Sequence, residues 1–127
     1  MLVDLAPGWK TDLDRGPGWL IVKLYGPNGD DADATGLAEC LHTMLRQEFK
    51  ERLLLELDQI QGMPWDFIRE LCLLREALEG RGAILRLCGM SAENESRLCQ
   101  RDALARFVHY RDREEAIAGF YRPGKPR

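Results

Sequence analysis

The sequence predicts an α/β fold in which a mixed β-sheet, made of an N-terminal hairpin and parallel strands, is faced by about four helices. Three observations predict this fold: a hairpin pattern near the N-terminus, a strand–helix–strand pattern in the middle, and two capped helices after it. The 127 residues suffice for one domain with its own hydrophobic core. We expect a single domain over residues 1–127, with a core at about 11–120 and a frayed tail at 122–127.

The hairpin is predicted from two apolar segments that a turn separates. Residues 19–25 (WLIVKLY) are rich in β-branched and aromatic residues, and residues 9–13 form a weaker outer strand. Residues 14–18 (DRGPG) supply the turn, and residues 26–33 (GPNGDDAD) follow as a flexible acidic loop. The outer strand could pair with a second copy of the chain, which would give a homodimer.

A first helix is predicted over residues 34–50, with its start capped by Asp31 or Asp33. Its apolar residues recur at helical spacing on one face: Ala34, Leu37, Ala38, Leu41, Leu45 and Phe49. Residues 53–57 (LLLEL) are nearly all apolar and are bounded by polar residues. That pattern is typical of a central strand that is buried on both faces.

A second helix is predicted over residues 64–80, with Pro64 in its first turn and Gly80 and Gly82 at its end. Residues 83–88 form the next strand, so residues 53–88 make a right-handed strand–helix–strand unit with parallel strands. Ser91 caps a third helix that runs to about residue 100. After a short strand at 107–110, Asp112 and Glu115 open a last helix through about residue 120.

Composition excludes several classes of protein. The chain has 18 basic and 21 acidic residues and a net charge of −3, whereas nucleic-acid-binding modules are usually basic. No run of about 20 apolar residues is present, so no membrane insertion is expected. The first residues lack a basic, apolar leader, and a cytoplasmic protein is expected. The four cysteines lack the spacing of a zinc site or a disulfide framework.

Catalytic signatures are scarce, and we expect no catalytic residues, no metal and no cofactor. His42 falls beside the apolar face of the first helix and His109 falls in a short strand, where structural roles are the simpler interpretation. Nucleophile-elbow and phosphate-binding glycine motifs are absent. The sequence therefore predicts a protein without enzymatic activity.

The loop over residues 58–66 is the most informative segment, because it leaves the carboxyl end of the central strand and enters the second helix. Partners and ligands of open α/β sheets bind at that edge. Asp66 lies in the first turn of the helix, where the helix dipole stabilises a carboxylate. Trp65 is either a partly buried anchor or an exposed contact residue, and the sequence favours neither.

Three segments in their order resemble the STAS domain, the fold of sulphate-transporter cytoplasmic domains and of bacterial anti-sigma factor antagonists. They are residues 54–58 (LLELD), 82–91 (GAILRLCGMS) and 107–116 (FVHYRDREEA), and the resemblance covers residues 11–120. It implies the same fold and a bacterial protein-interaction module in signal transduction and transcription regulation. The implied partner is an anti-sigma factor, which is a kinase-like ATPase, or a related regulator.

The chain departs from this family at its regulatory motif. Phospho-regulated antagonists carry D-S-S-G or D-S-T-G at this point, and the partner phosphorylates the second hydroxyl residue. Counting without gaps places Pro64, Trp65, Asp66 and Phe67 in the motif, so Asp66 replaces the phosphoacceptor serine. Asp66 carries one negative charge where phosphoserine carries about 1.5–2. It either mimics the phosphorylated form in part or serves a different partner.

The resemblance also implies a partner-binding surface, because the loop before the first helix lies beside the phosphorylation site in the family. This surface comprises Asp30, Asp31, Asp33, Asp58, Trp65 and Asp66, and it would attract a basic partner. The alternative is that these carboxylates are solvated loop charges and helix caps.

Two other functions stay open. The chain could be a STAS subunit of a larger assembly, such as a lipid-transport ATPase or a stress-signalling scaffold. A small-molecule or nucleotide-binding protein is the alternative from another class.

Overall fold

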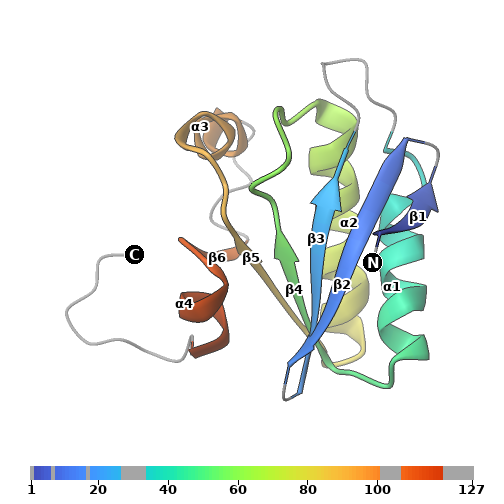
Figure 1. Ribbon diagram of the computed structural model, residues 1–127. Helices are drawn as coiled ribbons and strands as arrows, with labels where there is room; N and C mark the ends of the chain where they lie inside the picture. Colours follow the sequence, from blue (N-terminus) through green and yellow to red (C-terminus); the bar gives the residue numbers. More distant parts are fainter. Residues whose placement is uncertain (1, 7, 17, 27–33, 101–106, 119–127) are drawn as a thin grey trace.

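The computed structural model describes residues 2–6, 8–16, 18–26, 34–100 and 107–118, which form one six-stranded sheet with helices on both faces (Figure 1). The strands are β1 (Leu2–Ala6), β2 (Trp9–Gly16), β3 (Trp19–Tyr25), β4 (Arg52–Glu56), β5 (Ile84–Cys88) and β6 (Val108–Tyr110). The helices are α1 (Leu37–Gln47), α2 (Trp65–Gly80), α3 (Ala92–Gln100) and α4 (Arg113–Ala118). The predicted acidic loop at 27–33 and the tail lie outside the described residues.

The sheet is mixed, as predicted, and its strands follow the chain in the order β1-β2-β3-β4-β5-β6. β1, β2 and β3 are antiparallel neighbours, whereas β3, β4, β5 and β6 are parallel. The parallel strands therefore end together, at Tyr25, Glu56, Cys88 and Tyr110, and we call this the carboxyl edge. The loop from β4 to α2 begins there.

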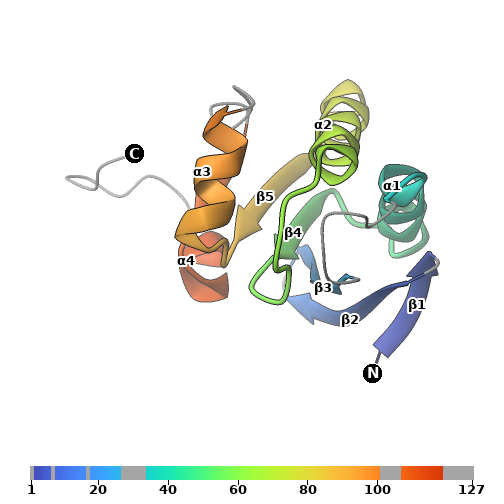
Figure 2. The same ribbon diagram turned by 90° about the horizontal axis from the view of Figure 1, so that it is seen from above.

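The two faces of the sheet have separate cores, because successive side chains of a strand point to opposite faces. One core includes Leu20 and Leu53 and lies under α1 and α2. The other includes Trp19 and Leu54 and lies against Ala116 of α4. Figure 2 shows α1 and α2 on one side of the sheet and α4 on the other.

The sequence reasoning missed β1. Residues 2–6 pair antiparallel with β2, so β2 is an inner strand and not the outer strand that was expected. β2 also runs to Gly16, which pairs with Trp19, so the two strands extend into the segment that was expected to be the turn. A five-residue segment has too weak a local preference to identify it as a strand, and its partner supplies the hydrogen bonds that define it.

The expected cap of the first helix is wrong. α1 starts at Leu37, and its N-cap is Gly36, which has a φ of 86° and makes no side-chain cap hydrogen bond. Glu70 of α2 supplies the acceptor instead, because its Oε1 receives a hydrogen bond of 2.9 Å from the Ala38 amide. A distant side chain thus takes the role that a local aspartate was expected to fill.

The expected end of the first helix is also wrong. α1 ends at Gln47, and Phe49 lies beyond it with a φ of 56° and a side chain that is 92% exposed. Phe49 therefore contributes nothing to the apolar face of α1. The other helix starts agree with the prediction: the Asn94 amide donates to Ser91 Oγ at 3.1 Å, and the Glu115 amide donates to Asp112 Oδ1 at 2.9 Å.

Candidate docking surface at the carboxyl edge

The loop from β4 to α2 is attached to the core by alternate residues. The Leu57 amide donates to the Cys88 carbonyl at 2.9 Å, which continues the sheet by one residue. Leu57, Ile60 and Met63 are buried in the core beneath α1 and α2. Asp58 and the glutamines at 59 and 61 are exposed between them. The loop therefore holds a fixed backbone while it presents polar side chains to solvent.

Asn94 of α3 supports this loop from the side. Its side chain is buried, and its Nδ2 donates to the Ile60 carbonyl at 3.0 Å. Its Oδ1 is buried and has no hydrogen-bond partner within the part of the chain that is described. Sequence reasoning missed Asn94, because an asparagine in the first turn of a helix is common and nothing local indicates that it reaches a distant carbonyl.

In the first turn of α2, Trp65 and Asp66 are exposed, whereas the next two residues, Phe67 and Ile68, are buried. Pro64 is the N-cap, and its carbonyl accepts hydrogen bonds from the Phe67 and Ile68 amides at 3.0 and 3.1 Å. Phe67 is buried and stacks on Trp9, with ring centroids 5.2 Å apart. Helical geometry then directs the two residues before Phe67 outward. Trp65 is 50% exposed, and the Asp66 side chain is 44% exposed.

Trp65 and Asp66 thus form an accessible pair on the first turn of α2. Half of Trp65 remains in contact with the protein, so it is both a partial anchor and an exposed contact residue. The Asp66 carboxylate lies 3.8 Å from the Arg69 guanidinium, and both side chains are nearly half-exposed, so this is a long and solvent-screened ion pair. The Asp66 carboxylate is therefore available to a partner.

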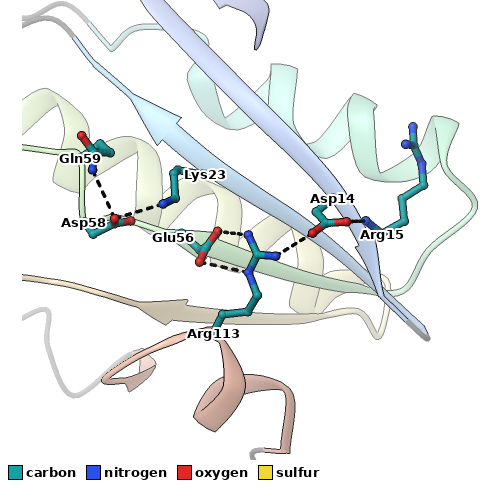
Figure 3. A network of polar contacts seen from close by, with 7 residues as sticks. All are labelled: Asp14, Arg15, Lys23, Glu56, Asp58, Gln59 and Arg113. Atoms are coloured by element: carbon teal, nitrogen blue, oxygen red, sulfur yellow. Dashed lines mark hydrogen bonds and ion pairs between the residues drawn. The ribbon is translucent and has the colours of Figure 1, made fainter. Parts of the chain in front are cut away.

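Asp58 is held more tightly than Asp66. Its Oδ2 accepts hydrogen bonds from Lys23 Nζ at 3.2 Å and from Gln59 Nε2 at 3.3 Å (Figure 3). Burial alone would raise the pKa of Asp58, but these hydrogen bonds outweigh it and hold the pKa below its usual value of 3.8. Asp58 is therefore charged at neutral pH, and Lys23 compensates its charge.

Gly89 allows β5 to approach Asp58 closely. Gly89 has a φ of 78°, and a Cβ atom there would lie 3.2 Å from Asp58 Cβ and 3.3 Å from the Asp58 amide nitrogen. Both the backbone conformation and the short contact favour glycine at this position. Gly89 thus sets the position of the first residue of the loop.

An ion-pair network lies on the α4 side of the sheet, next to Lys23 and Asp58 (Figure 3). Arg113 donates two hydrogen bonds to Glu56, at 3.1 and 2.5 Å, and a third to Asp14 at 2.6 Å. These hydrogen bonds raise the pKa of Arg113 above its ordinary value. The network joins β2, β4 and α4 and fixes the sheet beneath the carboxyl edge.

The remaining nucleophilic and titratable side chains favour structural roles. Burial, together with the nearby Glu56 and Asp58 charges, raises the pKa of the Cys88 thiol to about 12, so this thiol is unreactive at neutral pH. His42 is half-buried, and His109 Nδ1 lies 3.7 Å from Glu95. Within the described segments, no three His, Cys, Asp or Glu side chains are grouped so that they could hold a metal ion. No described helix is long and apolar enough to cross a membrane.

The structure places three of the six predicted surface residues. Asp58, Trp65 and Asp66 all lie on the loop and helix start that follow β4. Asp30, Asp31 and Asp33 lie outside the described residues, so their part in this surface stays a prediction. The arrangement offers one exposed aromatic side chain and one accessible carboxylate on a rigid base, which suits binding.

Comparison with solved structures decides the fold. A serine-to-glutamate variant of RsbS from Moorella thermoacetica matches with a TM-score of 0.72 at 11% identity, over 86% of this chain and 92% of that chain. The phosphorylated form of SpoIIAA, a Bacillus cell fate determinant, matches with a TM-score of 0.61 at 15% identity, over 86% and 97%. The chain has the STAS fold.

The expected resemblance to this fold is thereby confirmed. The unphosphorylated form of SpoIIAA, described as an anti-sigma factor antagonist, also matches, with a TM-score of 0.60 at 9% identity, over 88% of this chain and 99% of that chain. No protein-family model and no curated protein matches the sequence. At these identities most side chains differ between the chains, so the shared STAS fold does not by itself give this chain the function of its neighbours.

Proposed function

We propose that the protein is a non-enzymatic regulator that docks through its carboxyl edge on an anti-sigma factor or a related kinase-like regulator in the cytoplasm. By occupying that regulator it would release the regulator's other partner. The observation that carries the proposal is the exposed pair of Trp65 and Asp66, on the first turn of α2 in a STAS fold. The SpoIIAA neighbour, an anti-sigma factor antagonist, supports the same class.

The structure of the loop favours tight docking without rearrangement. Ile60 and Met63 are buried, and Asn94 holds the Ile60 carbonyl, so little conformational entropy is lost when a partner binds. Trp65 supplies the apolar contact area that interface hot spots need. Asp66 supplies a charge for a basic group of the partner, and we propose that Asp30, Asp31 and Asp33 add to it.

The carboxylate at position 66 removes the usual means of regulation. A family kinase needs a hydroxyl to phosphorylate, and Asp66 has none. A kinase of that type could therefore not switch this surface by phosphorylating residue 66.

Replacing Asp66 with serine tests the register on which this proposal depends. Incubated with ATP and a kinase-type anti-sigma factor from the same genome, the Asp66→Ser variant should gain one phosphoryl group by mass spectrometry, whereas the wild type should gain none. Asp58→Ser, on the same loop, is the matched control and should stay unmodified. Phosphorylation of the wild type, or none in Asp66→Ser, would contradict the assignment of Asp66.

Binding to the same anti-sigma factors tests the surface. Trp65→Ala and Asp66→Lys should each weaken binding about tenfold or more in calorimetric titrations, with unfolding midpoints close to that of the wild type. Leu73→Ala removes an apolar side chain that is similarly exposed but lies about two helical turns after Asp66, away from the carboxyl edge, and it should bind normally. The absence of anti-sigma factor binding, together with co-purification of an ATPase subunit, would favour a STAS subunit of a larger assembly instead.

A further inference from the structure

Phe49 has a backbone conformation that its side chain disfavours. Its φ of 56° makes it the one non-glycine residue with a positive φ among the described residues. The Phe49 amide donates to the Arg46 carbonyl at 3.1 Å, and the Lys50 amide donates to the Leu45 carbonyl at 3.3 Å. These two bonds are the Schellman motif, in which glycine is strongly favoured at the position that Phe49 occupies.

The side chain of Phe49 does not compensate for this strain by packing against the core. It is 92% exposed, which makes it the most exposed of the large hydrophobic side chains in the described part of the chain. A bulky residue that keeps a strained conformation without packing against the core is a candidate for a functional role.

Phe49 lies at the end of the molecule opposite the carboxyl edge. The end of β2 and the start of β3, the connection from α1 to β4 and the turn from α2 to β5 meet there, at the lower end of Figure 1. The basic side chains of these three segments form what we call the basic end: Arg15, Arg46, Lys50, Arg52 and Arg81.

The charge of the basic end is opposite to that of the whole chain. Four acidic residues lie within or beside it: Glu48 pairs with Arg15 at 2.5 Å and Glu51 pairs with Arg81 at 3.1 Å, whereas Asp14 and Glu79 pair with Arg113 and Arg75, which lie outside the basic end. Five basic residues thus face four acidic ones, two of which are compensated by arginines elsewhere, so the basic end has a net positive charge although the chain has a net charge of −3. The ion pairs of Glu48 and Glu51 tie the three segments together, so Phe49 projects from a fixed base.

We propose that the basic end docks reversibly on anionic lipid bilayers, with Phe49 entering the headgroup region and the surrounding lysine and arginine side chains contacting lipid phosphates. Exposed aromatic side chains partition to that depth, and basic residues beside them are attracted by anionic lipid. The long stems of Lys50 and Arg46 can lie along apolar surface while their charged groups reach the phosphates.

A lipid surface fits this end better than a protein surface does. The centre of a protein interface is depleted of charged residues, lysine above all, and its hot spots are ringed by contacts that exclude water. Phe49 instead projects among charged side chains and is almost fully exposed. A planar and deformable anionic surface can accept the aromatic ring and pair with the cations at the same time.

Substitution of Phe49 by glycine separates binding from stability. Glycine adopts a positive φ without strain, so Phe49→Gly should raise the melting temperature of the full chain by about 2–5 °C. In sedimentation with phosphatidylglycerol vesicles at low salt, the wild type should bind, and Phe49→Gly should lose most of that binding. Neither protein should bind phosphatidylcholine vesicles. If Phe49 instead stabilises the fold, Phe49→Gly should have a lower melting temperature than the wild type and should bind vesicles no differently from it.

Two matched controls test the specificity of the basic end. The Arg46→Gln/Lys50→Gln variant should lose binding to phosphatidylglycerol, whereas Arg69→Gln/Arg111→Gln removes as much positive charge elsewhere and should retain it. Leu73→Ala controls for the loss of another exposed apolar side chain. The proposal is overturned if the wild type does not bind phosphatidylglycerol vesicles, or if Phe49→Gly binds them as well as the wild type does. Loss of a protein partner by Phe49→Gly without vesicle binding would identify a protein-docking surface instead.

Discussion

Arg113 of α4 pairs with the buried carboxylate of Glu56 in β4, although 57 positions separate the two residues in the chain. Two hydrogen bonds of 3.1 and 2.5 Å join the guanidinium to the carboxylate, and the third bond of Arg113 reaches Asp14 in β2. Glu56 is the last residue of β4, so this pair holds α4 against the strand from which the candidate docking loop begins.

Removal of Arg113 should therefore destabilise the fold more than the loss of a surface ion pair would. Arg113→Met leaves the Glu56 carboxylate buried without its cation, and we expect a loss of about 2–3 kcal/mol in urea unfolding. The double variant Glu56→Met/Arg113→Met should recover part of that loss, because no unpaired charge is then buried. Additive effects of the two single substitutions would show that the residues do not act as a pair.

Glu70 should be needed for the start of α1. Glu70→Ala removes the acceptor of the Ala38 amide and leaves a buried donor unsatisfied, which should cost about 1–3 kcal/mol. Glu70→Gln retains an acceptor oxygen and should keep most of the stability. Hydrogen exchange should show faster exchange at the first turn of α1 in Glu70→Ala, and equal protection in both variants would rule out this role.

His42 should make the stability of the fold depend on pH. Burial, with Arg46 and Arg81 nearby, holds the pKa of His42 below its ordinary value of 6.5. The unfolded chain then binds a proton more readily than the folded chain, so stability is lost as the pH falls below about 6.5. In denaturant titrations from neutral to acidic pH, the wild type should lose stability relative to His42→Gln. A constant difference between the two proteins would contradict the lowered pKa.

Gly89 should be more sensitive to substitution than Gly82. Both glycines have a positive φ, of 78° and 76°, but a Cβ at Gly82 meets nothing within 4 Å, whereas a Cβ at Gly89 meets Asp58. Gly82→Ala should cost about 1 kcal/mol from backbone strain alone. Gly89→Ala should cost more, and it should also change the amide chemical shifts of residues 58–60. Equal costs would mean that the contact with Asp58 relaxes freely.

Local sequence patterns were sufficient to predict most helices and strands of the fold. The apolar run at 53–57, the helical spacing through α2 and the capping residues Ser91 and Asp112 depend on neighbours in the sequence, and the structure confirms them. Because these patterns depend only on neighbouring residues, they also gave the wrong end for the first helix. Phe49 continues the helical spacing of α1, yet the helix ends before it.

For the candidate site, the sequence located Asp58, Trp65 and Asp66 after the central strand, because an ungapped count from a clear strand suffices for that. It could not show that Lys23 compensates the charge of Asp58, or that Asn94 holds the loop. Those contacts join residues that are more than 30 positions apart.

By itself, the amino-acid sequence determined the class of fold, the order of strands and helices after β1, and the position of Asp66 at the start of α2. Only the tertiary structure decided that residues 2–6 join the sheet, that Glu70 completes α1, and that Trp65 and Phe49 are exposed at opposite ends. The physical reason is that periodicity and capping act over a few residues, whereas pairing, burial and charge compensation depend on which distant segments meet when the sheet forms.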